Sequence, residues 1–233
     1  MKKLGLIVNP IAGMGGRVGL KGTDGPDTLK IALGRGAVPL SPSRAIQSLE
    51  TLRGLQEDMT LFTFPGQMGE AEAVAAGIKP HVLLRDVITG VPTREHTLMA
   101  ARELLQKSVD LLLFAGGDGT ARDVAEVVNT DILALGIPSG VKIHSSVFAT
   151  SPRKAGELAK LVLSGKKTIE KYAEVMDIDE EAFRKGQVQA RLYSYLKIPF
   201  HRRHVQSLKS GSPASEGNAQ VEIAREVISQ MEK

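Results

Sequence analysis

The chain has 233 residues, of which 42% are apolar and 24% are charged, a balance typical of globular proteins and unlike that of disordered or fibrous chains. It contains no cysteine, which excludes a disulfide scaffold, a Cys-ligated zinc site and an iron–sulfur cluster. The formal charge of +4 comes from basic and acidic residues spread along the sequence, and no apolar run approaches the roughly 18 residues of a membrane span, so we expect no binding to nucleic acid or membrane.

Strand and helix patterns alternate through the first two thirds of the chain. In chain order, they predict a strand over residues 4–8, a helix over 41–53, a strand over 59–64, a helix over 69–76, a strand over 81–88, a helix over 94–107, a strand over 109–115, a helix over 121–128, a strand over 132–137 and a helix over 151–163. A long glycine-rich loop is expected after the first strand, and Gly54 is expected to stop the first helix. Residues 111–114 are all apolar, as in a central parallel strand that is covered on both faces. Residues 1–165 are therefore predicted to form an open, doubly wound parallel α/β domain.

The pattern changes after this domain. It predicts, in order, strands over residues 169–178 and 187–198, a linker over 207–218 and a helix with an apolar stripe over 221–231. Pro199 is expected to end the second strand, and the acidic run over 177–181 is expected to be a solvated strand end. Residues 166–233 are thus predicted to be the start of a β-rich domain, because two strands alone are marginal in water, followed by a linker and a C-terminal helix.

A glycine-rich segment lies where the apolar central strand gives way to a helix. Gly116, Gly117 and Gly119 remove side chains that would keep a phosphate from the backbone N–H groups at the helix start. Thr120 is expected to cap the helix or to bond a phosphate oxygen. A carboxylate and a phosphate repel each other, so Asp118 beside a phosphate is explained only if it holds a metal ion or accepts a proton from a substrate hydroxyl. Asp-Gly is also a common turn dipeptide, but so many glycines at a strand end favour a functional role.

The first loop carries Gly13, Gly15 and Gly16 shortly after Asn9. It does not complete a dinucleotide-binding fingerprint, because Val18 occupies the third glycine position, and the chain has no Gly-Lys-Ser/Thr of a P-loop. A flexible connector and a nucleotide cradle are both compatible with these residues. The position at the end of the first strand favours the cradle.

A third polar cluster follows the strand over 132–137, within residues 136–145. Its candidate site residues are Gly136, Ser139, Gly140, Lys142 and His144. Together with Ser145, they are expected at the same edge of the sheet as Asp118, where the lysine would neutralise a phosphate. A lone histidine is more often structural than functional, and it is the neighbouring lysine and glycines that favour a ligand-binding role here.

Three blocks together, residues 8–16, 115–123 (AGGDGTARD) and 136–149, resemble the ATP-NAD kinase-like family of the NAD kinase/diacylglycerol kinase superfamily, in its AcoX-related branch. The resemblance implies transfer of a phosphoryl group from ATP or polyphosphate to the adenosine 2′-hydroxyl of NAD, giving NADP. It implies that Asp118 acts on the acceptor hydroxyl, that the motif glycines and Thr120 approach the nucleotide phosphates, and that Mg²⁺ accompanies the donor. No metal-ligand set of the protein's own is predicted.

Two other functions remain open at this point. A non-catalytic nucleotide-binding accessory protein of the AcoX type would bind NAD or ATP without turnover. A diacylglycerol-type lipid kinase would be expected to carry a Gly-Thr-x-Asn-Asp-like block where this chain has residues 140–144.

The resemblance also implies features beyond the reaction. Related kinases complete the active-site cleft with a β-rich second domain, and by analogy with them we expect this protein to form a homodimer or a homotetramer. Met1 is followed at once by a strand pattern instead of a signal-peptide core, which predicts a cytoplasmic protein.

Overall fold

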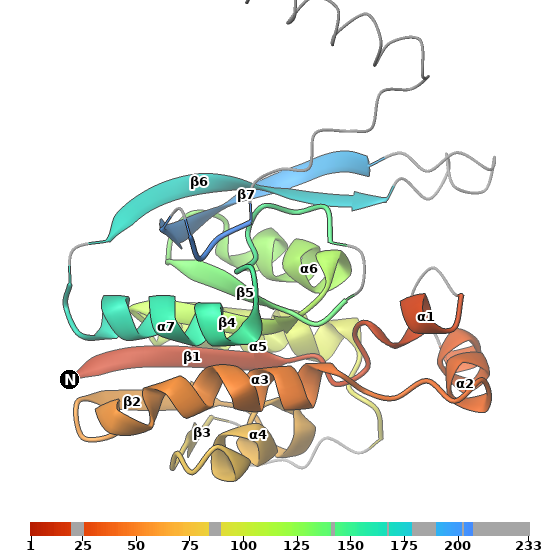
Figure 1. The fold of residues 1–233 in the computed structure, drawn as a ribbon, viewed down its shortest axis with the longest axis horizontal. Coiled ribbons are helices and arrows are strands. Elements are labelled where there is room, and N and C mark those ends of the chain that lie inside the picture. The colour runs from red at the N-terminus through yellow and green to blue at the C-terminus, as the bar shows by residue number, and fades with distance from the viewer. Residues whose placement is uncertain are drawn as a thin grey trace, which may run out of the picture.

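The computed structural model describes residues 1–19, 26–83, 90–140, 143–166, 168–178, 190–201 and 203–206. Their strands form a five-stranded parallel sheet of order β3-β2-β1-β4-β5 and a two-stranded antiparallel sheet, β6-β7 (Figure 1). The strands are β1 (Lys2–Val8), β2 (Met59–Thr63), β3 (His81–Val82), β4 (Leu111–Gly116), β5 (Ala134–Pro138), β6 (Ile169–Ile178) and β7 (Ala190–Phe200). The predicted α/β fold with an open parallel sheet is confirmed.

Helices cover both faces of the parallel sheet. They are α1 (Met14–Arg17), α2 (Pro26–Gly34), α3 (Ser41–Leu49), α4 (Glu70–Ala75), α5 (Arg94–Gln106), α6 (Asp118–Val128) and α7 (Pro152–Leu163), with 3-10 turns η1 (Glu50–Leu55) and η2 (Gly66–Met68). Helix α3 packs against α4 and α7 on one face, and α5 packs against α6 on the other (Figure 1). The sheet is thus the middle of three layers, as amphipathic helices on an apolar sheet require.

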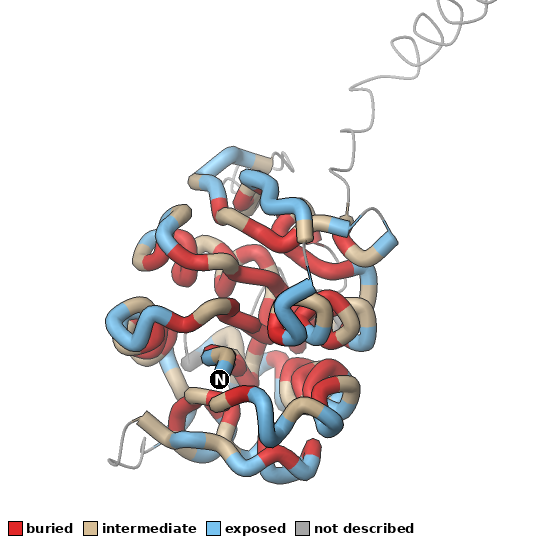
Figure 2. Tube along the Cα trace, turned by 90° about the vertical axis from the view of Figure 1, so that its left-hand side faces the viewer, coloured by how far each residue is buried: buried red, intermediate tan, exposed pale blue. Residues whose placement is uncertain are grey.

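The strand predicted to be central is the most completely buried one. All six residues of β4 are buried, and its neighbours are β1 on one side and β5 on the other. The buried residues run through the middle of the molecule, between the helices (Figure 2). The Phe114 ring of β4 meets the Phe148 ring edge to face, with 5.4 Å between the ring centroids, and this aromatic pair adds to the packing of the core.

The order of the strands reverses next to β1. From β1 the chain moves outward to β2 and β3, then returns through α5 to β4 on the other side of β1. The segments that leave β1 and β4 therefore diverge at a topological switch point, where open α/β sheets bind ligands at the carboxyl ends of their strands. The first two glycine-rich segments are the ones that leave these strands.

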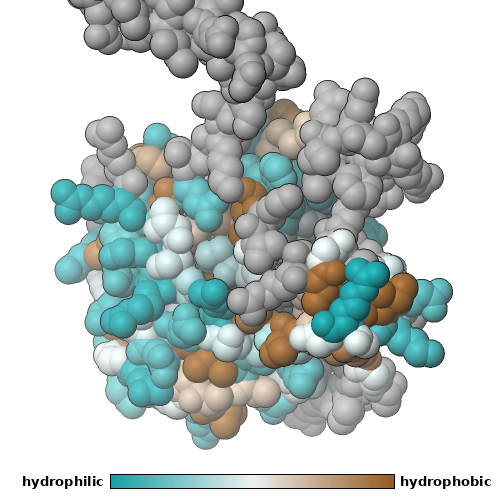
Figure 3. All heavy atoms as spheres, turned by 45° about the vertical axis from the view of Figure 1, so that its right-hand side comes forward, coloured by the Kyte–Doolittle hydropathy of each residue, from teal (hydrophilic) through white to brown (hydrophobic). Residues whose placement is uncertain are grey.

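The glycine-rich segment after β1 is not the simple loop that we predicted. It contains α1 and α2, which share a small apolar cluster of Met14, Ala32 and Ala37, separate from the main core. These helices form a lobe beside the sheet (Figure 1). Apolar side chains reach the surface in this region, among them Ile31 and Leu33 of α2 (Figure 3).

Several element boundaries also differ from the predictions. Gly54 does not stop the first helix, because η1 continues the turn to Leu55. Helix α6 begins at Asp118, three residues earlier than predicted, with Gly117 as its N-cap. The strand predicted over 81–88 is described only as β3, and residues 84–89 lie outside the described residues.

The β6-β7 hairpin packs on α6 through buried residues such as Val175 and Ile198. The prediction that Pro199 ends the second strand is wrong: Pro199 lies within β7, opposite Glu170. A strand in a two-stranded sheet has a free edge, where proline's missing N–H costs no ladder bond. The predicted linker and helix over 207–231 lie outside the described residues. In the part of the chain that the structure describes, no helix is both long enough and apolar enough to cross a membrane.

Candidate active site

The segment after β1 and the glycine-rich segment after β4 are joined by a side-chain hydrogen bond. Asn9 donates from Nδ2 to Thr120 Oγ1 at 3.1 Å, and its backbone N–H donates to the Ala115 carbonyl at 3.0 Å. Thr120 is 3% exposed. The structure thus places the Thr120 hydroxyl in the contact between the two segments, below the surface.

The segment after β5 joins the same edge of the sheet. Its Ser139 donates from the backbone to the Gly116 carbonyl at 3.0 Å. Gly13 adopts a left-handed backbone, with φ of 80°, and a Cβ added there would clash with the carbonyl oxygen of Ser139 and press on Gly140. Only glycine therefore allows the first segment to lie this close to the third. The three segments singled out in the sequence meet at one edge.

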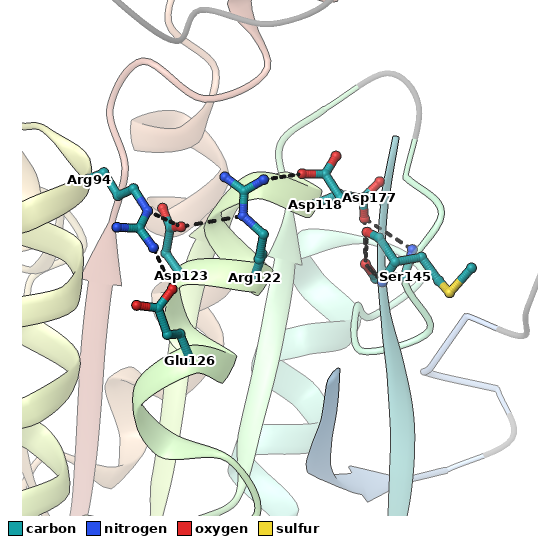
Figure 4. A network of polar contacts seen from close by, with 8 residues as sticks. Arg94, Asp118, Arg122, Asp123, Glu126, Ser145 and Asp177 are labelled. Carbon is teal, nitrogen blue, oxygen red and sulfur yellow. Dashed lines mark hydrogen bonds and ion pairs between the residues drawn. The ribbon is translucent and has the colours of Figure 1, made fainter. Parts of the chain in front are cut away.

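Asp118 ties the second segment to the third. Its side chain lies at the start of α6, and the residue is 8% exposed. Oδ1 accepts hydrogen bonds from the Ser145 backbone N–H at 3.0 Å and from Ser145 Oγ at 2.6 Å (Figure 4). Oδ2 accepts one from the His144 backbone N–H at 2.8 Å. The carboxylate is therefore held in one orientation by three donors.

The histidine of this cluster contributes through its backbone. The imidazole Nε2 of His144 is buried and has no hydrogen-bond partner among the described residues. Ser145, which the sequence analysis placed at this edge without assigning it a role, contributes both its N–H and its hydroxyl. The sequence gives no pattern that pairs this serine with Asp118, so only the coordinates show its role. Lys142 lies outside the described residues.

The glycines at this edge fall into two groups. A Cβ added at Gly116 would clash with Thr120, and one added at Gly136 would clash with the Phe148 ring. A Cβ added at Gly117 or Gly119 would meet no described atom within 4 Å. The first group is therefore explained by packing of the protein itself. The second group is not, and it lies at the N-terminus of α6, where the first backbone N–H groups have no intrahelical acceptor.

Gly15 and Gly16 are placed differently from the prediction of a loop that wraps a ligand. Both lie within α1, whose N-cap is Gly13. The contact of this segment with the rest of the site is made by Gly13 and Asn9.

A chain of ion pairs runs beside the site from α5 through α6 to β6 (Figure 4). Arg122 contacts Asp177 of β6 at 3.1 Å and Asp123 at 3.7 Å, and Arg94 contacts Asp123 at 2.9 Å and also pairs with Glu126. Burial lowers the pKa of the Arg122 guanidinium, but interactions with Asp177, Asp123 and Tyr193 together raise it by more, so that the net shift is upward. The expectation that Asp177 belongs to a solvated strand end is wrong, because its side chain is only 20% exposed and pairs with Arg122 of α6.

A surface hollow of about 390 Å³ lies at the opposite edge of the sheet. Four of its charged groups form two ion pairs: Lys2 Nζ lies 2.6 Å from Asp110, and Lys197 Nζ lies 3.7 Å from Glu170. Open α/β sheets bind ligands at the other edge, and we assign no site here.

The fold and the three converging segments define a kinase-like α/β domain. The family model described as the ATP-NAD kinase N-terminal domain matches residues 4–167, and the chain belongs to that family. No curated protein matches the chain. The AcoX-related branch named above stays a prediction.

Solved structures from Bacillus anthracis str. Sterne, described as a diacylglycerol kinase in one case and as a candidate one in two, are similar to the chain at 19–20% identity and a TM-score of 0.31. They match 73% of this chain, while the chain spans 44–47% of theirs, which is less than half of their length. This likeness is too remote to bear on the substrate.

Proposed function

We propose that the protein transfers a phosphoryl group from ATP or polyphosphate to the adenosine 2′-hydroxyl of NAD, giving NADP. Membership of the ATP-NAD kinase N-terminal domain family supports this choice of acceptor. The arrangement of the three segments at the switch point of the sheet supports a phosphate-bearing ligand at this edge.

The observation that carries the proposal is the open pair of glycines at the start of α6. Gly117 and Gly119 have ordinary backbone angles that other residues adopt, and an added Cβ would meet no described atom within 4 Å. The fold itself therefore does not require glycine at either position. A phosphate that approaches the backbone N–H groups of a helix N-terminus does require it, because side chains there would occupy the space of the ligand.

Asp118 is the residue proposed to act on the acceptor hydroxyl. Its carboxylate lies in the first turn of α6, between the two open glycines in sequence, and is held by three hydrogen bonds. Most of the acceleration in phosphoryl transfer comes from positioning and from stabilising charge, so a carboxylate fixed in one orientation suits this role.

Mg²⁺ is proposed to accompany the phosphoryl donor, where it would neutralise charge on the phosphates. Among the described residues, no group of three or more His, Asp and Glu side chains is arranged to hold a metal ion. Mg²⁺ commonly keeps several waters and binds substrate phosphates with few protein ligands. These residues therefore fit a cation that is held mainly by the donor's phosphates and by water.

The test is formation of NADP by the purified protein from NAD and Mg²⁺ with ATP or polyphosphate, measured in a coupled assay. We expect turnover in the wild type and a loss of about 10²-fold or more in kcat for Asp118→Asn, as for removal of a group that receives a proton. Asp131→Asn is the matched control, because this exposed aspartate follows the other end of α6. It should keep kcat within about twofold.

The outcomes separate the competing functions. Phosphorylation of diacylglycerol without NADP formation would replace the proposal by a lipid kinase. A rise in melting temperature with NAD or ATP, without turnover on either acceptor, would indicate an accessory nucleotide-binding protein. Full activity of Asp118→Asn would remove Asp118 from its proposed role.

A further inference from the structure

The Ser145 hydroxyl lies between the Asp118 carboxylate and the β6-β7 hairpin (Figure 4). Its Oγ is 2.6 Å from Asp118 Oδ1, 2.8 Å from the Met176 carbonyl oxygen and 2.9 Å from the Met176 N–H, which donates to it. Ser145 is 1% exposed, so water does not compete for these bonds. The hydroxyl has one hydrogen, and a charged acceptor forms the stronger bond, so this hydrogen belongs to the ionised carboxylate.

The two oxygens of Asp118 are unequal as a result. An ionised carboxylate has about four acceptor positions, two on each oxygen. Ser145 occupies both positions on Oδ1 with its N–H and its O–H, whereas His144 occupies one position on Oδ2. Counting donors from the described residues, one acceptor position remains, and it belongs to Oδ2.

We propose that Ser145 is a positioning residue that saturates Asp118 Oδ1, leaving Oδ2 as the oxygen that takes the proton of the acceptor hydroxyl, and that links this carboxylate to the hairpin. The inference rests on the proposed function. In the reaction, the O–H bond of the acceptor breaks and its proton goes to Oδ2. The acceptor oxygen forms a bond to the terminal phosphorus of the donor. The bond from that phosphorus to its bridging oxygen breaks, and the electron pair leaves with the shortened donor.

The neighbouring serine provides a matched control. Ser146 also binds the hairpin: its N–H donates to the Glu174 carbonyl at 3.0 Å, and its Oγ accepts from the Glu174 N–H at 2.9 Å. The hydroxyl oxygen of each serine thus accepts a backbone N–H of β6, from Met176 in one case and from Glu174 in the other. Of these two serines, Ser145 is the one that is hydrogen-bonded to Asp118. Ser146→Ala therefore removes the hydroxyl contacts with Glu174 of the hairpin and leaves the bond from Ser145 to the carboxylate in place.

The kinetic experiment compares Ser145→Ala, Ser146→Ala and Ser145→Thr with the wild type in the NADP assay. We expect Ser145→Ala to lower kcat by about 10- to 100-fold, with KM for NAD and for the donor within about threefold, because a misplaced carboxylate slows the transfer more than it weakens binding. Ser146→Ala should keep kcat within about threefold, and Ser145→Thr, which retains a hydroxyl, should recover most of the loss. Equal losses in the two alanine variants would overturn the inference.

A second experiment needs no activity. Urea unfolding of Ser145→Ala, Asp118→Asn and the double variant forms a double-mutant cycle. Each substitution changes the unfolding equilibrium constant by some factor. For Ser145→Ala with Asp118→Asn, we expect the factor of the double variant to be at least about fivefold smaller than the product of the two single factors. For Ser146→Ala with Asp118→Asn, we expect the factor of the double variant to equal that product within about twofold. Independent effects for Ser145 and Asp118 would overturn the inference even in an active enzyme. A coupled pair in a protein that forms no NADP would instead refute the proposed function and leave the positioning contact established.

Discussion

Gly119→Ala should make the protein more stable and less active at the same time. Gly119 lies in the first turn of α6, its backbone angles suit alanine, and an added methyl group would meet no described atom within 4 Å. Replacing glycine by alanine at such a position stabilises by about 0.4–1 kcal/mol, because the unfolded chain loses freedom and the helix gains propensity. For a chain of this size, that corresponds to a rise in melting temperature of about 1–4 °C.

The same methyl group would stand where we propose that the phosphates approach the N–H groups of α6. We therefore expect kcat/KM for NADP formation to fall by at least about tenfold, which corresponds to about 1.4 kcal/mol of lost transition-state binding. Thermal unfolding and the NADP assay measure the two effects on one preparation. Gly54→Ala is the control. A Cβ added at Gly54 would likewise meet no described atom within 4 Å, and Gly54 lies in η1, before β2, at the opposite edge of the sheet from the proposed phosphate site. It should keep full activity. Unchanged kcat/KM in Gly119→Ala would refute the use of these glycines for phosphate binding.

Three further substitutions test other parts of the structure. Gly136→Ala would drive a methyl group into the Phe148 ring, so we expect urea unfolding to show a loss of about 1–3 kcal/mol, and an unchanged midpoint would refute the packing argument. Burial raises the pKa of the Glu72 carboxyl in the folded protein above its unfolded value of about 4.3. The stability that this carboxyl contributes is therefore fully present below about pH 4.3 and is lost as the pH rises through the pKa of the folded state. Glu72→Gln should therefore gain melting temperature relative to the wild type between pH 4 and pH 8, and a constant difference would contradict this. Arg122→Ala breaks the contact with Asp177, so amide hydrogen exchange along β6 should accelerate, whereas unchanged exchange would show that the ion pair does not hold the hairpin.

The parallel sheet could be predicted because its strands carry a strong signal. The uninterrupted apolar run over residues 111–114 identifies a strand that is buried on both faces, and β4 has that place in the structure. The carboxyl ends of parallel strands share one edge, so the meeting of the three glycine-rich segments follows from the order of the elements.

The parts that could not be predicted depend on contacts between distant residues. Helix α2 is an exception: it starts at Pro26 and contains the good helix formers Leu29, Lys30, Ala32 and Leu33, but the glycines around it led to the prediction of a loop. Asp177 looks like part of an acidic surface run until the fold brings Arg122 beside it. The bonds from Ser145 to Asp118 span 27 residues, and no local pattern encodes them.

The pairing of β1 with β4 has a consequence for how the molecule folds. Leu4 lies beside Leu111, so a growing chain must hold β1 with one edge unpaired until more than a hundred further residues have been made. Closing a loop of that length costs about 4 kcal/mol in chain entropy beyond a constant, which is recovered only when the whole strand docks. The hydrogen bond from Asn9 to Thr120 forms across this same junction. Docking of β4 on β1 and formation of the junction between the first two glycine-rich segments are therefore one event, and a chain in which β4 has not docked lacks that part of the site.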